Sequence, residues 1–468
     1  MPLRNGKASF PRPYPGAKTP PVSFPIEPGG DGFMYWISKS FHLLNRIQKQ
    51  LMIFLSVLGP GIIVMVADND AGGISTYAVT GSKHGFSLLW IFIVLLPMAY
   101  YVQEMTVRLG AVTKRGHAEA IFDGFGPFWG WFTIIDLGII NWLTLITEFI
   151  GMTAAMSLFG VPEWLTVICV ILVLFAVVLT GKYWTFEKIT LFFVGFNFVY
   201  IPAALWAMET PYAPGWSEVF KGFYAPDVGK MNLDLVFIIL ANIGTTITPW
   251  QIFFQQSAVV DKGLDVHDIR FGRIETLVGV CLTCLVAIFI IIATGAVFFY
   301  HHPQIIIEDA KQTAEAFVPL LPAVEGNLAR KLFAIGLFDA GFLGALCISL
   351  STSWAVGEVF GWAHSLNQRV KDAPWFYIVY FLILLTSGIV VLIPGAPLVS
   401  ITMYVQVVAV TLLPVSLIFL IILLNDSNVM GEYVNTQWQN IMNISIAAFV
   451  IIVSTLMGIG TLFPDLYK

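Results

Sequence analysis

Long apolar segments recur along this chain and restrict its fold more than any other feature of the sequence. Eleven of them are long enough to cross a lipid bilayer as a helix, which takes about 20 residues. The sequence is 57% hydrophobic and only 11% charged, which excludes an ordinary soluble globular domain. We therefore predict an all-α polytopic membrane protein with eleven transmembrane helices. Their approximate bounds are 51–80, 86–107, 131–159, 164–181, 189–208, 233–260, 275–300, 330–362, 375–394, 399–424 and 440–463.

The chain before the first apolar segment divides into two parts. Residues 1–33 are rich in Pro and Gly and contain no apolar stretch, so we predict a disordered cytoplasmic tail rather than a signal peptide. Residues 34–50 mix aromatic and aliphatic side chains with Lys and Arg, which is typical of an amphipathic helix at the membrane interface. Residues 51–468 form the predicted transmembrane domain.

Basic residues predict how the chain is oriented in the membrane. Most of the 24 Lys and Arg residues fall in the tail and in loops on the same side of the predicted bilayer. Because cytoplasmic loops carry such an excess, we predict a cytoplasmic N-terminus in the cell membrane, and an odd number of spans puts the C-terminus outside. The lipid bilayer is the expected surrounding; nothing in the sequence indicates a nucleic-acid partner, and we expect a monomer. The four cysteines lie in apolar segments, where packing is the simplest role.

The first span contains a polar interruption. Its apolar run meets Asp68, Asn69 and Asp70, and then the small residues Ala71–Gly73, before apolar residues resume at Ile74. A carboxylate at the centre of a bilayer costs about 2.5–3.5 kcal/mol on insertion scales, so it predicts a functional site. Adjacent glycines suit a helix that stops and restarts. We interpret this stretch as a cation site in a broken helix.

The sixth span is interrupted as well. Pro249 follows Asn242–Thr248 and frees a backbone carbonyl about one turn earlier, near Thr245. Two broken helices five spans apart predict two inverted five-helix repeats with the substrate between them. The repeats would cover about 51–208 and 233–424, and 440–463 would be an extra helix. A simple proline kink is the alternative for the sixth span alone.

Several motifs are spread along the chain from Gly59 to about Asn440. They are Gly59-Pro60-Gly61, R-L-G-A-V-T-K-R-G-H-A-E at Arg108–Glu119, Thr147–Gly151, A-I-G-L-F-D-A-G-F-L-G from Ala334, Q-V-V-A-V-T-L-L-P from Gln406, and Met430–Asn435. Together these motifs resemble those of one family, the NRAMP (natural resistance-associated macrophage protein) divalent-metal transporters.

The resemblance implies a metal site at the two breaks. Asp70 matches the family's metal-binding Asp, and Thr245 aligns with the residue whose backbone carbonyl binds the metal. Gln406 matches a family glutamine near the site. Its side chain could either contact the ion or form an interhelical hydrogen bond. With Asp68 and Thr248 added, these residues form the predicted metal site.

The site also departs from the family pattern. Gly73 replaces a metal-binding Asn, and Thr248 stands in place of a thioether ligand. Trp250 and Gln255 occupy the two positions where the family has histidine. This pattern resembles the branch called NRAMP-related magnesium transporters, which implies transport of Mg²⁺, with Mn²⁺, and no coupling to protons.

Residue chemistry favours a hard cation independently of the resemblance. A thioether favours transition metals, and replacing it with Thr248 leaves oxygen donors around Asp70. Loss of the Asn side chain at Gly73 predicts a larger cavity. Mg²⁺ keeps several of its waters and is typically held by one or two carboxylates. The hydroxyls of Thr245, Thr246 and Thr248 and the amide of Gln251 could bind those waters as an outer shell. Asp68 is either a direct ligand or a vestibule charge that attracts cations.

Titratable residues bear on proton coupling. All seven histidines fall in loops or at span ends, so none can act as a relay in mid-membrane. The ninth span has no Arg or Lys from Trp375 to Leu392, where the family usually keeps an arginine. The third span keeps a polar stripe of Asn141, Thr144 and Glu148, which is either a packing seam or a proton wire. The other acids within the predicted spans that could carry a proton are Asp136 and Asp339.

These observations lead to one function and one alternative. We predict a secondary transporter that imports partly hydrated Mg²⁺, and Mn²⁺, by alternating access without proton coupling. The alternative is a proton-coupled Mn²⁺/Fe²⁺ importer of the mainstream NRAMP type. A channel or receptor is disfavoured because the sequence has no filter-like repeat and no appended sensing domain. No catalytic motif is found, so we predict no enzyme activity and no cofactor, with the metal ion as substrate.

Overall fold

A computed structural model describes residues 59–210, 213–226, 233–302, 305, 307, 311–315, 323–396 and 398–462. These residues form helices joined by turns and loops, with no β-strand among them. The predicted all-α class is therefore confirmed. The predicted tail at 1–33 and amphipathic helix at 34–50 lie outside the described residues.

The helices of the first predicted repeat include two interrupted spans. The first span is split into two helices, and the fifth changes to a 3₁₀ turn in its middle. Their bounds are α2 Pro60–Ala67, α3 Ala71–His84, α4 Ile91–Thr113, α5 His117–Phe125, α6 Pro127–Ser157, α7 Glu163–Val178, α8 Tyr183–Val194, the 3₁₀ turn η1 Gly195–Val199, and α9 Tyr200–Glu209.

The second half of the chain begins with a short helix and again contains a split span, the sixth. Its bounds are α10 Trp216–Tyr224, α11 Leu233–Thr246, α12 Pro249–Lys262, α13 Ile269–Thr294, the π-helical turn η2 Gly295–Phe299, α15 Ala323–Phe360, α16 Pro374–Val391, α17 Leu398–Asn425, α18 Ser427–Met430, the 3₁₀ turn η3 Gly431–Tyr433, and α19 Gln437–Leu462.

Every predicted span overlaps a helix, and the breaks in the first and sixth spans are confirmed. Eight helices within the described ranges are long and apolar enough to cross a membrane, and α7 is a shorter apolar helix. The count of eleven spans stays a prediction. Helices α5 and α10 were not predicted, because they are short and amphipathic and lie in the connections between spans.

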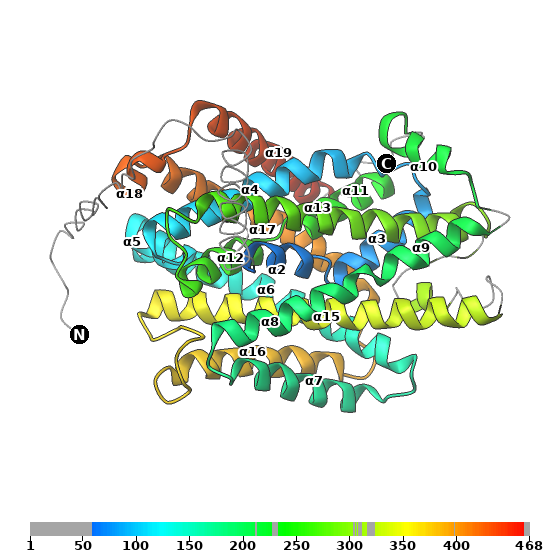
Figure 1. Cartoon of the computed structure of the whole chain (residues 1–468), viewed down its shortest axis with the longest axis horizontal. Coiled ribbons are helices and arrows are strands. Elements are labelled where there is room, and N and C mark those ends of the chain that lie inside the picture. Colours follow the sequence, from blue (N-terminus) through cyan, green and yellow to red (C-terminus); the bar gives the residue numbers. More distant parts are fainter. Residues whose placement is uncertain are drawn as a thin grey trace, which may run out of the picture. The chain divides into compact units, whose positions relative to one another are not determined.

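The two halves of the broken first span lie in the interior of the bundle. Both α2 and α3 pack against α13 and also contact α15 (Figure 1). The long helix α6 packs along α15, while α12 packs between α4 and α15. The split helices are therefore surrounded by continuous ones, which hold the interruptions at fixed positions.

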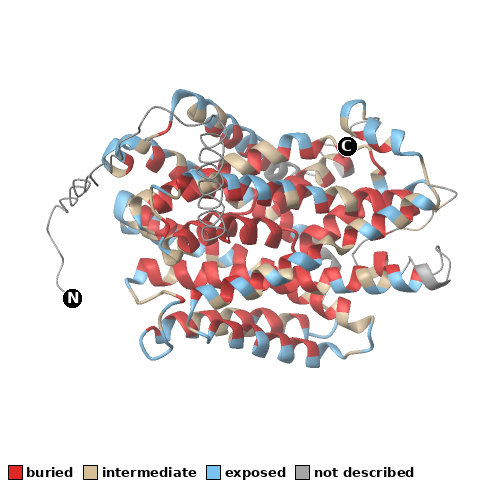
Figure 2. Cartoon of the chain, in the orientation of Figure 1, coloured by how far each residue is buried: buried red, intermediate tan, exposed pale blue. Residues whose placement is uncertain are grey.

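Side-chain burial agrees with a membrane setting. Buried residues concentrate in the central helices, and exposed residues are more frequent on the outer helices and in the loops (Figure 2). On α7, α16 and α19 the outward residues are large and apolar, for example Leu172, Leu382 and Ile444. Such continuous apolar faces are exceptional on soluble proteins and normal where a helix meets lipid.

Candidate metal-ion site

The break in the first span is a three-residue linker that ends one helix and begins the next. Asp68 follows the last residue of α2, and its backbone N–H still donates to Met65 O at 3.3 Å. Asp70 is the N-cap of α3, where its Oδ1 accepts a hydrogen bond from Gly73 N at 2.6 Å. The positive end of the α3 dipole therefore points at the Asp70 carboxylate.

The break in the sixth span contains no charged residue. Thr248 has extended backbone angles, and Pro249 begins α12, where its missing N–H costs no helical hydrogen bond. The Thr248 N–H donates to the side-chain Oε1 of Gln251 at 3.2 Å. Ile247 and Thr248 thus separate two helix ends, as the position of the proline predicts.

One side chain joins the two breaks. Gln251 donates from Nε2 to Asp68 Oδ1, and its Oε1 accepts a second hydrogen bond from Gln103 Nε2 on α4 at 3.2 Å. All three residues are buried. Gln251 was predicted only as a possible partner for waters around the ion. In this structure it contacts the acid of the opposite repeat directly.

Thr245 and Gln406 lie over the two glycines that follow Asp70. A Cβ atom added to Gly73 would lie 2.9 Å from Thr245 Oγ1 and 3.3 Å from Asp70 Oδ1. A Cβ at Gly72 would overlap Gln406 Nε2. The structure therefore brings Asp70, Thr245 and Gln406 together. The predicted extra space at Gly73 is not found here, because the Thr245 hydroxyl fills it.

Thr246, which was predicted to bind waters of an outer shell, forms hydrogen bonds to neighbouring protein groups in this structure. Its hydroxyl donates to Asn242 O at 2.8 Å and lies 3.1 Å from the Tyr77 hydroxyl on α3. Asn242 in turn donates to Thr80 Oγ1 at 2.7 Å. These bonds fasten α11 to α3 beside the site.

Glu148 of α6 also reaches the break. Its Oε2 accepts a hydrogen bond from Ala71 N at 3.0 Å, and its Oε1 accepts one from Thr147 Oγ1 at 3.2 Å. A Cβ at Gly344 would lie 2.8 Å from Glu148 Oε2 and 3.1 Å from Asp70 Cβ. Sequence reasoning treated Glu148 as part of a polar stripe and did not include it in the site.

Five oxygens at or beside the breaks have no hydrogen-bond partner among the described residues. They are Asp68 Oδ2, Asn69 Oδ1, Asp70 Oδ2, Thr245 Oγ1 and Thr248 Oγ1, and each of these residues is at most 1% exposed. Buried polar atoms are normally paired, so unpaired ones indicate a missing ligand or water. No group of three or more His, Cys, Asp or Glu residues that could hold a metal occurs in the described ranges. A cation here would therefore rely on two acids and neutral oxygens.

Two cavities lie at opposite ends of this region. One of about 160 Å³ is lined by Ala71, Ser75 and Thr147, directly beside the start of α3. The other, of about 390 Å³, is lined by Ser257 of α12 and Glu358 of α15. The two hollows thus adjoin the split spans, one beside α3 and the other beside α12.

Comparison with known proteins gives the same fold and architecture. The profile of the family described as natural resistance-associated macrophage protein-like (Nramp) matches residues 61–460. The chain belongs to this family. The divalent metal cation transporter MntH of Caldanaerobacter subterraneus subsp. tengcongensis is 25% identical over 416 residues, which are 87% of this chain and 94% of the relative.

Two further similarities span a comparable length. The MntH transporter of Listeria innocua is 27% identical over 409 residues, covering 84% of this chain and 87% of the relative. The crystal structure of the Eremococcus coleocola manganese transporter, in complex with an aromatic bis-isothiourea substituted compound, superposes with a TM-score of 0.72. It is 21% identical and covers 88% of each chain, and so supports the fold. As an Nramp protein, the chain is a multi-pass membrane transporter rather than an enzyme.

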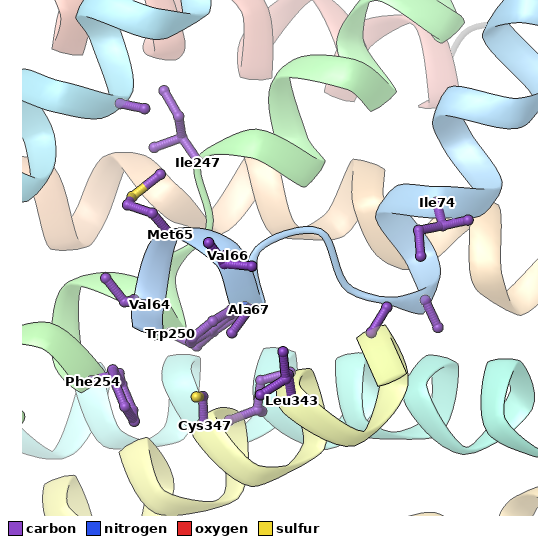
Figure 3. Close-up of a cluster of buried hydrophobic side chains, with 14 of the residues drawn as sticks. Val64, Met65, Val66, Ala67, Ile74, Ile247, Trp250, Phe254, Leu343 and Cys347 are labelled. Atoms are coloured by element: carbon purple, nitrogen blue, oxygen red, sulfur yellow. The ribbon is translucent and has the colours of Figure 1, made fainter. Parts of the chain in front are cut away.

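Both positions that depart from the Nramp histidines have packing roles. Trp250 is buried in an apolar cluster beside the end of α2, together with Ala67 and Leu343 (Figure 3). Gln255 is also buried and bonds only to hydroxyls, accepting from Thr106 and donating to Thr276 at 3.1 and 3.0 Å. Neither residue offers a titratable group.

Sequence reasoning missed Glu275, which holds the start of α2. Its Oε1 accepts hydrogen bonds from the backbone N–H groups of Gly59, Gly61 and Ile62, the latter two at 3.0 and 3.1 Å. A helix begins with free N–H groups, and a carboxylate there both caps them and complements the dipole. Glu275 is the first residue of the predicted seventh span, 275–300, and its only charged residue, and that was the available signal.

Proposed function

We propose that this chain carries divalent metal cations across the membrane by alternating access, with Mg²⁺ as the preferred substrate and Mn²⁺ as a second one. The observation that carries the proposal is the pair of buried carboxylates, Asp68 and Asp70, at the meeting point of two broken helices. Each has an oxygen without a partner in the described part of the chain. The relatives named as divalent metal cation transporters support the substrate class.

The donor chemistry supports a hard, partly hydrated ion. Carboxylate, hydroxyl, amide and backbone oxygens suit Mg²⁺ and Mn²⁺, whereas a soft sulfur ligand would favour later transition metals. Asp70 supplies the first charge, Asp68 the second, and Thr245, Thr248 and Gln406 the neutral donors. Mg²⁺ loses its waters reluctantly, so the ion binds with part of its shell and the protein contacts the remainder.

We propose that transport needs no proton. In the third span the Asn141 amide donates to Ser351 and Thr352 of α15, both at 2.8 Å, so this part of the polar stripe is used for packing. The ninth span, α16, has no basic residue, and Trp250 and Gln255 cannot titrate near neutral pH. The ion's own gradient and the membrane potential would then drive uptake, at about 2.3 kcal/mol per charge per 100 mV.

One observation favours the alternative, a proton-coupled Mn²⁺/Fe²⁺ importer. Glu148 is buried beside Asp70 and bonds to the first backbone N–H of α3. A carboxyl in that position could exchange a proton as the metal arrives. The alternative therefore depends on Glu148.

We also propose an oligomeric state, an orientation in the membrane and a repeat organisation for this chain. The chain would function as a monomer, with its N-terminus in the cytoplasm and its C-terminus outside. Residues 51–208 and 233–424 would be the inverted repeats, and the last helix, at 440–463, an addition to them.

The proposal is tested with purified protein in liposomes of a polar lipid mixture. Uptake of Mg²⁺, Mn²⁺ and Ca²⁺ is compared under an inside-negative potential, with a pH-sensitive dye in the lumen. We expect Mg²⁺ and Mn²⁺ to enter without metal-dependent acidification. Absence of uptake of any divalent ion would contradict the proposed substrate class. Acidification in proportion to metal uptake would favour the alternative.

A further inference from the structure

A second group of buried polar side chains lies away from the two breaks, between the fifth and eighth spans. Asp339 of α15 accepts a hydrogen bond at Oδ2 from Asn197 Nδ2, at 2.7 Å. Asn197 belongs to the 3₁₀ turn η1, and Tyr200 begins α9 one turn later. Exposure is 3% for Asp339, 0% for Asn197 and 1% for Tyr200.

A second contact between the fifth and eighth spans lies one helical turn away from this group. A Cβ at Gly336 would lie 2.6 Å from Tyr200 Cζ, so the tyrosine ring packs directly on the α15 backbone one turn before Asp339. Aromatic pairs close the group on either side: Tyr200 with Phe333 at 5.2 Å, and Phe193 with Phe342 at 4.6 Å. The polar side chains are therefore enclosed in an apolar surrounding.

Three oxygens in this group have no hydrogen-bond partner within the described residues: Asp339 Oδ1, Asn197 Oδ1 and Tyr200 Oη. The ion pairs found in the described ranges are elsewhere, and none includes Asp339. A buried carboxylate without a positive partner is strongly unfavourable when ionised. An amide hydrogen bond alone does not neutralise it.

The backbone at this point is also irregular. The fifth span changes from α-helix to 3₁₀ geometry over Gly195–Val199 before α9 begins. A 3₁₀ stretch within a helix often marks a hinge, and it redirects carbonyl oxygens away from the α-helical ladder. Irregular backbone at membrane depth is tolerated where it is buried in protein or lines a cavity.

We propose that Asp339, Asn197 and Tyr200 form a binding site for a monovalent alkali cation at this turn of the fifth span. One carboxylate balances one positive charge, and the amide and phenol oxygens replace part of the water shell. A divalent ion would leave a net charge buried here, because no second acid belongs to the group. The site is separate from the metal site at the breaks. A bound cation would fasten η1 to α15.

Direct binding by the purified protein tests the proposal without any transport. We expect saturable ²²Na⁺ binding in choline chloride, and at least about tenfold weaker binding in Asp339→Asn. We also expect NaCl or KCl to raise the Tm by about 2 °C over choline chloride at equal ionic strength, as a ligand that binds only the folded state does. The Asp339→Asn protein should lose this shift.

Asp136→Asn is the matched control, because Asp136 is also a buried acid with an unpartnered Oδ2, but lies in an uninterrupted part of α6. It should keep the Na⁺ shift. If Asp339→Asn does not fold, Asn197→Ala provides the test, since it removes one proposed ligand and should also weaken ²²Na⁺ binding about tenfold. No alkali-cation shift in the unmodified protein would overturn the proposal. So would a Tm that depends on pH through Asp339 while Na⁺ has no effect, because the occupant would then be a proton.

Discussion

The two breaks differ in charge although they occupy corresponding positions in the predicted repeats. The first break contains two acids, Asp68 and Asp70, whereas the second contains Ile247 and Thr248 and no charge. Both are buried, and each ends one helix and begins another. If the two breaks bind the transported ion as proposed, the first would neutralise the charge of the cation, and the second would provide neutral oxygens that determine which cation fits.

The hydrogen bond from Gln251 to Asp68 means that the two roles are not independent. The neutral break positions one of the two acids. A substitution in either break should therefore also affect the other break. Several substitutions can test whether the two breaks have the separate roles described above. The expected effects below run from largest to smallest.

Removing the charge of Asp70 should have the largest effect. Asp70→Asn keeps the side-chain shape and an oxygen for Gly73 N, but removes the negative charge from a buried site. We expect Mg²⁺ uptake in liposomes to fall at least about 100-fold, since a buried unpaired charge costs about 3–5 kcal/mol and each 1.4 kcal/mol is tenfold. Asp136→Asn should keep most of the uptake. Near-normal uptake by a well-folded Asp70→Asn protein would remove Asp70 from the site.

Removing the link between the breaks should have the next largest effect. Gln251→Leu leaves Asp68 without its amide donor and Thr248 N without its acceptor. Losing a hydrogen bond to a charged group costs about 1.5–3 kcal/mol, so we expect uptake to fall about tenfold or more.

The matched control is Gln255→Leu, one turn further along α12. Gln255 bonds to two hydroxyls and no acid, so its replacement should lower uptake less than about threefold. Equal losses in the two variants would show that the Gln251 effect is one of general packing.

Making both breaks resemble the mainstream family should change selectivity. Thr248→Met with Gly73→Asn adds a soft ligand and an amide, and we expect the Mn²⁺/Mg²⁺ uptake ratio to rise about tenfold, or about 1.4 kcal/mol. Because Thr245 Oγ1 occupies the space at Gly73, the pair should be measured with and without Thr245→Ala. An unchanged ratio in an active protein would locate selectivity outside these positions.

Glu148 should give the smallest effect if the chain transports metal without protons. Glu148→Gln keeps an oxygen for the Ala71 N–H but has no carboxyl group to bind and release a proton. We expect Mg²⁺ uptake to change less than about threefold, with no metal-dependent acidification before or after the substitution. Acidification in the unmodified protein that disappears in Glu148→Gln would restore the proton-coupled alternative.

Local sequence signals predicted both breaks and part of the site. Gly72 and Gly73 after two acids, and Pro249 in an apolar run, interrupt a helix wherever the rest of the chain lies. The resemblance to Nramp transporters then assigned Asp70, Thr245 and Gln406 to one site. The structure brings these three residues together, and their role in binding metal stays a prediction.

Contacts between distant parts of the chain could not be predicted in this way. The partners in the Gln251–Asp68, Glu275–Gly61 and Asn197–Asp339 hydrogen bonds are 183, 214 and 142 residues apart. Each such pair depends on helix rotation and depth, which a single sequence does not determine. Helices α5 and α10 were missed for a different reason, because a search for long apolar runs cannot find short amphipathic helices.

The attachment of α2 to α13 has a mechanical consequence. Glu275 holds one end of this short helix, while Thr283, two turns further along α13, donates from its hydroxyl to Met65 O near the other end. In between, a Cβ on Gly279 would lie 2.9 Å from Gly61 O, so the two backbones are almost in contact. The half-helix α2 is therefore fastened to α13 at both ends, and the linker that follows it is tied to the same helix, because Asn69 Nδ2 donates to Thr283 O at 3.3 Å. We expect α2 and α13 to move as one body in any change of conformation.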